Sequence, residues 1–423
     1  MLIGHDAVRE AGVTGGKDEI WGQVPYAFVV MRKPISEAEL IQFCRTHLAA
    51  YKVPKKIMKV ETLPRNASNK LLRAQAIRIS RRGETFMIDI EKAQVSIVSI
   101  PLKKPFSTHL GVVREREAIM IELWDREGEV GYGETVAFSS PWYTEETVKT
   151  AYHIQKDFIL PMVLKKKFAH PREFACEFSS LRGNPMAKSG VETALWDLYA
   201  KKQGQSLSRI LGGTRNEVRA GAVVATQDVT EALKQIEQFT EQGFERMKLK
   251  ISPANDRQFI QAIRKEYPKT PLMVDANSAY TLEDIDQLRA LDEFELLMIE
   301  QPLGTTDIVE HAILQKQINT PICLDESITN VHDAKSAIQL GSCQIINIKI
   351  GRVGGLAIAK QIHDLCQEHQ LQAWCGGMIE FGISKAYNLA LASLPGFTLP
   401  GDLSSSTHYF HPLLARRYYH ARD

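Results

Sequence analysis

Met247-Lys248-Leu249-Lys250-Ile251 is the first of five short apolar runs that each contain, or end at, an ionisable residue. These residues recur at nearly equal intervals: 25 residues lead from Lys250 to Asp275, 25 to Glu300, 25 to Asp325 and 24 to Lys349. The intervening segments have the spacing of amphipathic helices. A short apolar run followed by a helix, repeated with this period, is typical of the βα units of a parallel barrel.

The strand ends of such a barrel converge on one mouth, where active sites lie. This arrangement places Asp275, Glu300 and Asp325 side by side. Three carboxylates at close range cannot all stay ionised without a compensating charge. A divalent cation that prefers oxygen ligands supplies it, which predicts a Mg²⁺ site at which Mn²⁺ could substitute. The alternative is that each acid caps a helix or pairs with a surface base, but their common register favours the metal site.

Two lysines occupy alternate positions of the first run, so Lys248 and Lys250 share the face that points into the barrel, while the apolar residues face the helices. Burying two ammonium groups is costly unless they have partners or a role. Close to one another and to a metal, their pKa should fall from about 10.4 towards neutrality, as a general base requires. Lys349 comes from the sixth strand, so a bound substrate would have a lysine on each face.

This set of residues resembles the muconate-lactonising subgroup of the enolase superfamily, from about Met87 to the C-terminus. Within the subgroup, the o-succinylbenzoate synthase / N-succinylamino acid racemase family is the most similar. The likeness rests on Phe-Ser-Ser-Pro-Trp-Tyr at 138–143, Gly-Arg-Val-Gly-Gly at 351–355 and Gly-Gly-Met-Ile-Glu-Phe-Gly-Ile at 376–383. It implies an α/β fold with an α+β capping domain and a modified (β/α)7β barrel.

The resemblance also implies a reaction, the magnesium-dependent dehydration of 2-succinyl-6-hydroxy-2,4-cyclohexadiene-1-carboxylate to o-succinylbenzoate in menaquinone synthesis. Lys250 would remove the α-proton and then protonate the departing hydroxyl. Lys349 would hold the dienolate by its charge, and Lys248 would lower the pKa of Lys250. The alternative is racemisation of N-succinylamino acids, alone or alongside dehydration, with one lysine acting on each face. The same residues would also serve a dipeptide epimerase or a cycloisomerase.

Further substrate contacts are expected from the resemblance at Phe138, Trp142, Arg352, Gly377, Met378 and Glu380. Phe138 and Trp142 match lid positions, and packing between domains is the alternative for both. Arg352 would lower the pKa of Lys349 or pair with a surface acid; in the family an arginine here accompanies racemisation. The backbone amides of residues 351–355 would hold an anionic substrate tail. Glu380 would hydrogen-bond a lysine or the substrate.

Residues 1–83 resemble a different family, the small C-terminal domain of adenylate-forming acyl-CoA ligases, and among these o-succinylbenzoate–CoA ligase. A strand is expected within 21–30 and a capped helix at 36–44, and Lys70 matches the lysine motif of the family. Without the large nucleotide-binding domain we expect this segment to be catalytically inert. It is either a true fusion or a gene-boundary read-through, because residues 81–83 can be encoded by a ribosome-binding sequence just before Met87.

Four regions are therefore predicted. They are a ligase-like segment (1–83), a capping domain (87–210), a barrel (211–402) and a tail that returns to the capping domain (403–423). The capping domain should contain antiparallel strands at 95–98 and 118–124. The eighth barrel strand is expected at 397–400.

Composition is that of an ordinary soluble protein, with 44% apolar and 24% charged residues. A net charge of +2 with scattered bases argues against a nucleic-acid partner. The sequence shows no apolar run of membrane-spanning length and no secretory segment, and the six cysteines form no CxxC pair. We predict a cytoplasmic enzyme with reduced thiols and a small carboxylate substrate. A homo-oligomer, and contact with an acyl-CoA ligase through residues 1–83, are both compatible with the sequence.

Overall fold

The computed structural model describes residues 1–18, 22–63, 65, 71, 87–108 and 111–411. Lys70, residues 81–83 and the tail after His411 lie outside the described residues. The chain divides into two compact units, one of residues 1–86 with 199–206 and the other of 87–198 with 207–423. Among the residues described, no helix combines the length and the apolar character that crossing a membrane requires.

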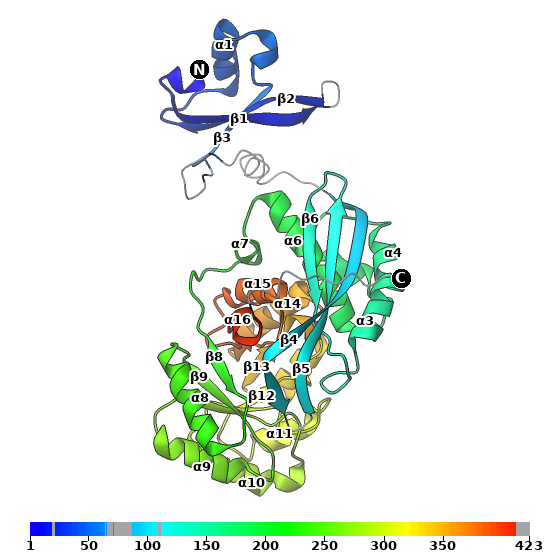
Figure 1. Ribbon diagram of the computed structural model, residues 1–423, viewed down its shortest axis with the longest axis vertical. Coiled ribbons are helices and arrows are strands. Elements are labelled where there is room, and N and C mark those ends of the chain that lie inside the picture. Colours follow the sequence, from blue (N-terminus) through cyan, green and yellow to red (C-terminus); the bar gives the residue numbers. More distant parts are fainter. Residues whose placement is uncertain (19–21, 64, 66–70, 72–86, 109–110, 412–423) are drawn as a thin grey trace. The chain divides into compact units, whose positions relative to one another are not determined.

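The first unit is a three-stranded sheet with one covering helix (Figure 1). Strands β1 (Val8–Asp18) and β2 (Gly22–Met31) pair antiparallel, and β3 (Lys56–Lys59) runs parallel to β2. Helix α1 (Glu37–His47) begins at Ser36, whose hydroxyl accepts from the Glu39 amide in a capping box. The predicted strand and capped helix are both confirmed. The unit also contains the short 3₁₀ turns η1 (Leu2–Gly4) and η2 (Ala50–Lys52).

The second unit begins with an antiparallel sheet in the order β6-β5-β4-β7. Its strands are β4 (Ile88–Thr108), β5 (Gly111–Asp125), β6 (Val130–Thr135) and β7 (Lys167–Phe168). The predicted strands 95–98 and 118–124 lie within β4 and β5, with Ser96 opposite Met120. The helical segments that follow are α3 (Val148–Ile154), η3 (Gln155–Ile159), α4 (Leu160–Val163), α5 (Glu173–Glu177), α6 (Pro185–Gln203) and α7 (Leu207–Leu211).

A parallel sheet forms the barrel, with seven strands that neighbour each other in sequence order. These are β8 (Gly221–Val224), β9 (Arg246–Lys250), β10 (Leu272–Asp275), β11 (Ile299–Glu300), β12 (Ile322–Leu324), β13 (Ile345–Ile348) and β14 (Gln372–Cys375). The expected eighth strand at 397–400 is instead two isolated bridges, Phe397 to Ala373 and Gly401 to Ala220, which join β14 to β8. The pairing there is too short for a strand, but it still closes the ring.

Helices lie on the outside of these strands, as α8 to α11 do in Figure 1. Helices and turns between and after the strands are α8 (Val229–Glu241), α9 (Asp256–Glu266), η4 (Leu282–Asp284), α10 (Ile285–Ala290), η5 (Leu291–Phe294), α11 (Val309–Gln315), α12 (Val331–Leu340), α13 (Ile350–Val353), α14 (Leu356–Glu368), α15 (Gly382–Ala392) and α16 (Ser406–Tyr409). Met247, Leu249 and Ile251 pack with residues of these helices in the main core, as predicted from their alternation with the lysines.

All six cysteines are free thiols, and only Cys176 is exposed. Cys323 lies in β12 as expected. Cys343 was expected in a strand but precedes β13, where it is buried. The thiols therefore have a packing role, as the sequence indicated.

Two buried glutamates of the β6 and α6 segments, called the capping segments below, hold the starts of barrel helices. Glu134, at the end of β6, accepts the backbone N–H groups of Phe381 (2.8 Å) and Ser384 (2.9 Å) at the start of α15. Glu192, in α6, accepts those of Leu356 (2.8 Å) and Ala357 (2.9 Å) at the start of α14. The first turn of a helix has unpaired N–H groups and a partial positive charge, so each carboxylate fixes a helix relative to the capping segments.

Glu192→Gln should become relatively more stable as the pH rises. Burial raises the pKa of Glu192 from 4.5 to about 7, so its contribution to stability falls between those two pH values. Glutamine does not titrate. The free energy of unfolding of the variant, measured against wild type, should therefore increase by about 3 kcal/mol between pH 4 and pH 8. Urea denaturation at both pH values measures this, and a difference that does not change with pH would contradict it.

Candidate active site

Strand register brings the predicted charged residues to one end of the barrel. Lys250 lies opposite Asp275, and Asp275 lies opposite Glu300, at the ends of β9, β10 and β11. Asp325 and Lys349 directly follow β12 and β13. The carboxylates are at most 2% exposed. Sequence spacing thus placed these residues together correctly, because parallel strands of one barrel end at one mouth.

Each of the three carboxylates faces a lysine. The Nζ–oxygen distances are 2.7 Å for Lys250–Asp275, 3.1 Å for Lys248–Glu300 and 2.8 Å for Lys349–Asp325. Buried carboxylates need positive charge nearby, and in this structure the lysines provide it.

The three carboxylates are the candidate ligands for a divalent cation. Within the described ranges, no three His, Cys, Asp or Glu side chains stand in an arrangement that could hold a metal ion. The chemistry of the donors nevertheless fits magnesium, since three buried carboxylates lie at the ends of adjacent strands and supply oxygen ligands. A cation among them would take over the compensating charge that the lysines now supply.

The predicted fall in pKa is wrong in direction for Lys248, and so is the lower pKa that Arg352 was expected to give Lys349. Burial lowers the pKa of Lys248, but the carboxylates of Asp402, Glu300 and Asp275 outweigh burial and raise it. Burial also lowers the pKa of Lys349, and the Tyr143 hydroxyl and Glu300 raise it above its ordinary value. The prediction counted lysines and a metal as neighbours, whereas here the neighbours are negative.

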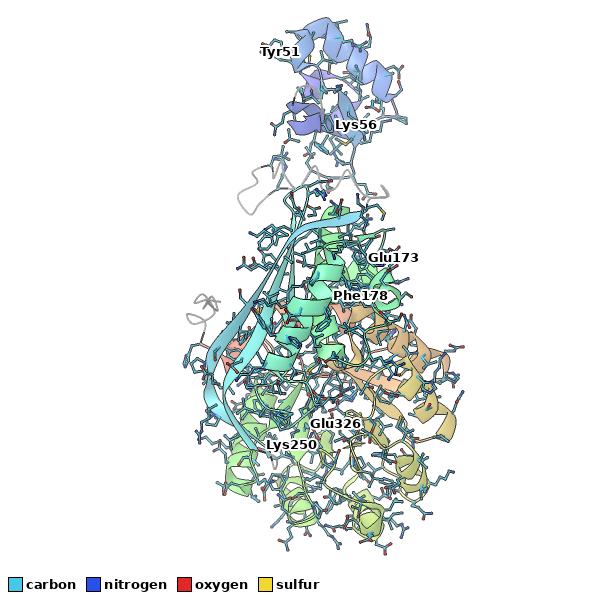
Figure 2. All side chains as sticks on the ribbon, turned by 90° about the vertical axis from the view of Figure 1, so that its right-hand side faces the viewer. Tyr51, Lys56, Glu173, Phe178, Lys250 and Glu326 are labelled. Carbon is cyan, nitrogen blue, oxygen red and sulfur yellow. The ribbon has the colours of Figure 1, made fainter. Side chains whose placement is uncertain are left out.

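Asp402 and Asn277 are polar residues of the site that were not predicted. Asp402 Oδ2 lies 2.7 Å from Lys248 Nζ, and its other oxygen lies 2.8 Å from Arg246. Asn277 Oδ1 accepts from Lys250 (2.7 Å) and its amide donates to Glu326 (3.1 Å); Lys250 and Glu326 are labelled in Figure 2. An acid two residues after the expected eighth strand, and an amide two residues after a metal candidate, were the signals that could have found them.

Arg352 is buried rather than paired with a surface acid, so that alternative is wrong. Its guanidinium contacts an oxygen of Asp325, and its Nε donates to the Ile328 carbonyl (2.8 Å). The anion-binding role predicted for residues 351–355 is not supported either. The amides of Val353, Gly354 and Gly355 donate to backbone carbonyls of residues 349–351, and the next two amides, which open α14, bond to Glu192.

Glu380 forms an ion pair with a lysine, the first of its two predicted partners, rather than the expected hydrogen bond. Its Oε2 lies 3.1 Å from Lys385 Nζ, and its Oε1 accepts from the Met378 amide at 2.6 Å and from Asn388 at 2.9 Å. These bonds hold the loop after β14. Ile379 in this loop has a φ of 58°, which a β-branched residue rarely adopts.

A cavity of about 570 Å³ opens at this mouth. Its lining residues are Phe106, Phe138, Trp142, Tyr143, Val223, Lys248, Lys250, Asp275, Asn277, Lys349, Gly377, Met378, Ile379, Lys385, Asp402 and Tyr409. Of the six predicted substrate contacts, Phe138, Trp142, Gly377 and Met378 line it. Arg352 and Glu380 are not among the lining residues. Phe138 and Trp142 also pack together, with ring centroids 4.6 Å apart.

Tyr143 ties the capping segment to the charged cluster. Its hydroxyl accepts from Lys349 Nζ and from Arg352 Nη1, both at 3.0 Å, and lies 3.1 Å from an oxygen of Asp325. Sequence analysis singled out its neighbour Trp142 instead.

Tyr143→Phe should lower the free energy of unfolding by about 1–3 kcal/mol, because two buried cations lose a hydrogen-bond acceptor. Tyr51→Phe is the matched control, since Tyr51 is 75% exposed and should change stability by less than about 0.5 kcal/mol. Chemical denaturation of both variants measures the difference. Equal effects would show that the Tyr143 hydroxyl contributes nothing.

Three family descriptions match the chain. Residues 231–422 match "Enolase C-terminal domain-like", and residues 91–212 match "Mandelate racemase / muconate lactonizing enzyme, N-terminal domain". Residues 1–70 match "AMP-binding enzyme C-terminal domain". The two predicted resemblances, to the enolase superfamily and to acyl-CoA ligases, are both confirmed.

Curated relatives and solved structures agree with these matches. The chain is 53% identical to the o-succinylbenzoate synthase of Bacillus subtilis over 77% of this chain and 87% of that protein. It is 41% identical to the N-succinylamino acid racemase of Thermus thermophilus, over 79% and 90%. A crystal structure of an enolase-superfamily member from Listeria innocua, 44% identical, superposes with a TM-score of 0.74 over 77% of this chain and 88% of that chain. The chain belongs to the o-succinylbenzoate synthase / N-succinylamino acid racemase family of the enolase superfamily.

Proposed function

We propose that this protein is an o-succinylbenzoate synthase, a carbon–oxygen lyase that removes water from 2-succinyl-6-hydroxy-2,4-cyclohexadiene-1-carboxylate. The observation that carries the proposal is the pair of lysines, Lys250 at the end of the second barrel strand and Lys349 after the sixth, with three buried carboxylates between them. Curated relatives that are 43–53% identical carry this name. The substrate class is a small carboxylate, as is usual in the family.

Asp275, Glu300 and Asp325 would hold the magnesium ion that enolase-superfamily members use, and Mn²⁺ could substitute. When bound, the metal stabilises negative charge on the substrate carboxylate. The ion pairs of the three acids with lysines support this assignment, because they show that these buried carboxylates need a positive charge nearby, which a metal ion would also supply.

The lysines have separate roles in this proposal. Lys250, with 13% of its side chain exposed, reaches the cavity, whereas Lys248 is 3% exposed and held by Asp402 and Glu300. Lys250 Nζ takes the α-proton and returns it to the departing hydroxyl on the same face, so that water leaves. Lys349 holds the negative charge of the dienolate from the other face, and Lys248 fixes the electrostatic field at Lys250.

Racemisation of N-succinylamino acids is the second candidate, and the same pair of lysines favours it. One lysine would remove the α-proton from one enantiomer and the other would protonate the opposite face. Arg352, which contacts Asp325 beside Lys349, fits the arginine that accompanies this activity in the family.

A steady-state comparison tests both functions. The cyclohexadiene carboxylate and N-succinylamino acids are assayed side by side with magnesium. Dehydration without racemisation is expected for a dedicated synthase, and comparable kcat/KM values for a bifunctional enzyme. Turnover of neither substrate would overturn the proposal.

The remaining assignments are also proposals. We infer capping (87–210), barrel (211–402) and tail (403–423) regions, a cytoplasmic location and a homo-oligomer. The ligase-like region 1–83 would bring the enzyme to an acyl-CoA ligase. Deleting residues 1–86 should leave turnover unchanged and weaken co-purification with that ligase, and unchanged co-purification would leave the region without this role.

A further inference from the structure

Four lysines line the described cavity, and one of them is not paired with a predicted metal ligand. Lys248, Lys250 and Lys349 each face one of the three acids. Lys385, in the first turn of α15, instead pairs with Glu380. Its charge is thus free of the metal site and available to another part of a substrate.

The donors of the Lys385 ammonium are only partly used. An ammonium has three N–H groups; the Lys385 nitrogen forms an ion pair with Glu380 Oε2 at 3.1 Å and donates one hydrogen bond to the Asp402 carbonyl at 3.4 Å. The Asp402 carboxylate itself is engaged by Lys248 and Arg246. With 10% of its side chain exposed, Lys385 keeps a donor for an anion that enters the cavity.

The position of Lys385 is fixed in advance. Its partner Glu380 also accepts from the Met378 amide and from Asn388, which lies one turn further along α15. The start of α15 is held by Glu134. A cation held by a rigid surrounding binds an anion with less loss of side-chain freedom than a mobile surface lysine.

Barrel topology places Lys385 away from the predicted metal ligands. It follows β14, and residues 397–401 join β14 to β8. Asp275 and Glu300 end β10 and β11, in the middle of the strand order. In a closed ring these two positions face each other across the mouth. Asp275 and Lys385 line the same cavity.

We propose that Lys385 binds the terminal carboxylate of the substrate's succinyl group, while the carboxylate next to the reacting carbon lies at the three acids across the mouth. This inference rests on the proposed function and extends it. Both candidate substrates carry a succinyl group, so one lysine would recognise the end that they share. Their different reacting ends would meet the same pair of lysines, Lys250 and Lys349.

The test compares two ligands by titration calorimetry, with magnesium present. One is o-succinylbenzoate, and the other is 2-butanoylbenzoate, in which a methyl group replaces the terminal carboxylate. Lys385→Gln removes the charge but keeps a donor for Glu380. We expect the variant to bind o-succinylbenzoate roughly 10- to 100-fold more weakly, with its affinity for 2-butanoylbenzoate unchanged.

Two further variants sharpen the comparison. Lys385→Arg keeps the charge and should keep the preference for o-succinylbenzoate. Lys360→Gln is the matched control, because Lys360 is also a helical lysine paired with an acid, Asp364, but does not line the cavity. It should change neither affinity.

Equal losses for both ligands in Lys385→Gln would mean that Lys385 only supports its loop, and would overturn the inference. Wild-type protein that does not prefer o-succinylbenzoate would overturn it too, even if Lys385→Gln fails to fold. A Lys385-dependent preference in a protein that turns over no succinyl substrate would overturn the proposed function and leave the binding role standing.

Discussion

Lys250→Ala should reduce kcat for dehydration by about 10²- to 10⁴-fold, the usual contribution of a positioned general base. Lys250 reaches the cavity from the end of β9 and has Asp275 and Asn277 as its partners. Alanine removes the only group in the proposal that can take the α-proton on that face. KM should change far less than kcat, because the metal ligands and the far end of the cavity remain.

Exchange of the α-proton with solvent distinguishes the role of Lys250 from that of Lys349. With N-succinylamino acids in deuterated water, Lys250→Ala should abolish exchange of one enantiomer and Lys349→Ala that of the other. Lys360→Ala serves as control and should keep both. A dehydration rate within a few-fold of wild type in Lys250→Ala would remove Lys250 as the base.

Asp325→Asn should lower the free energy of unfolding by about 3–5 kcal/mol in metal-free buffer, because it leaves buried cations without their counter-charge. Lys349 and Arg352 both contact the Asp325 carboxylate, and none of the three side chains is more than 8% exposed. The variant should also bind magnesium more weakly, since one of three carboxylate ligands becomes a neutral amide.

Asp286→Asn is the matched control. Asp286 pairs with Arg289 on the surface of α10, with side chains 87% and 45% exposed, and such pairs contribute less than about 1 kcal/mol. Urea denaturation without metal, followed by magnesium titration, measures both effects. A loss in Asp325→Asn no larger than in Asp286→Asn would contradict a charge-paired Asp325.

The sequence alone was sufficient to predict the structural features that depend on residue spacing within one segment of the chain. An interval of about 25 residues between Lys250, Asp275, Glu300 and Asp325 predicted the barrel and placed the acids at one mouth, because parallel strands end together. The alternation of lysines with apolar residues at 247–251 predicted which face of β9 carries the lysines. The cap and helical pattern at 36–44 predicted the start of α1, because the capping groups, Ser36 and Glu39, lie within four residues of each other.

Only the tertiary structure decided which groups meet across long separations. Tyr143 contacts Lys349, which lies 206 residues later in the sequence, and Glu192 contacts the start of α14, 164 residues later. The second contact occupies the amides that directly follow the glycine-rich segment. Charge behaves in the same way: the pKa of Lys248 rises because Asp402 packs against it from the last segment of the barrel. Burial and electrostatic fields depend on what folds alongside a residue, which local sequence does not specify.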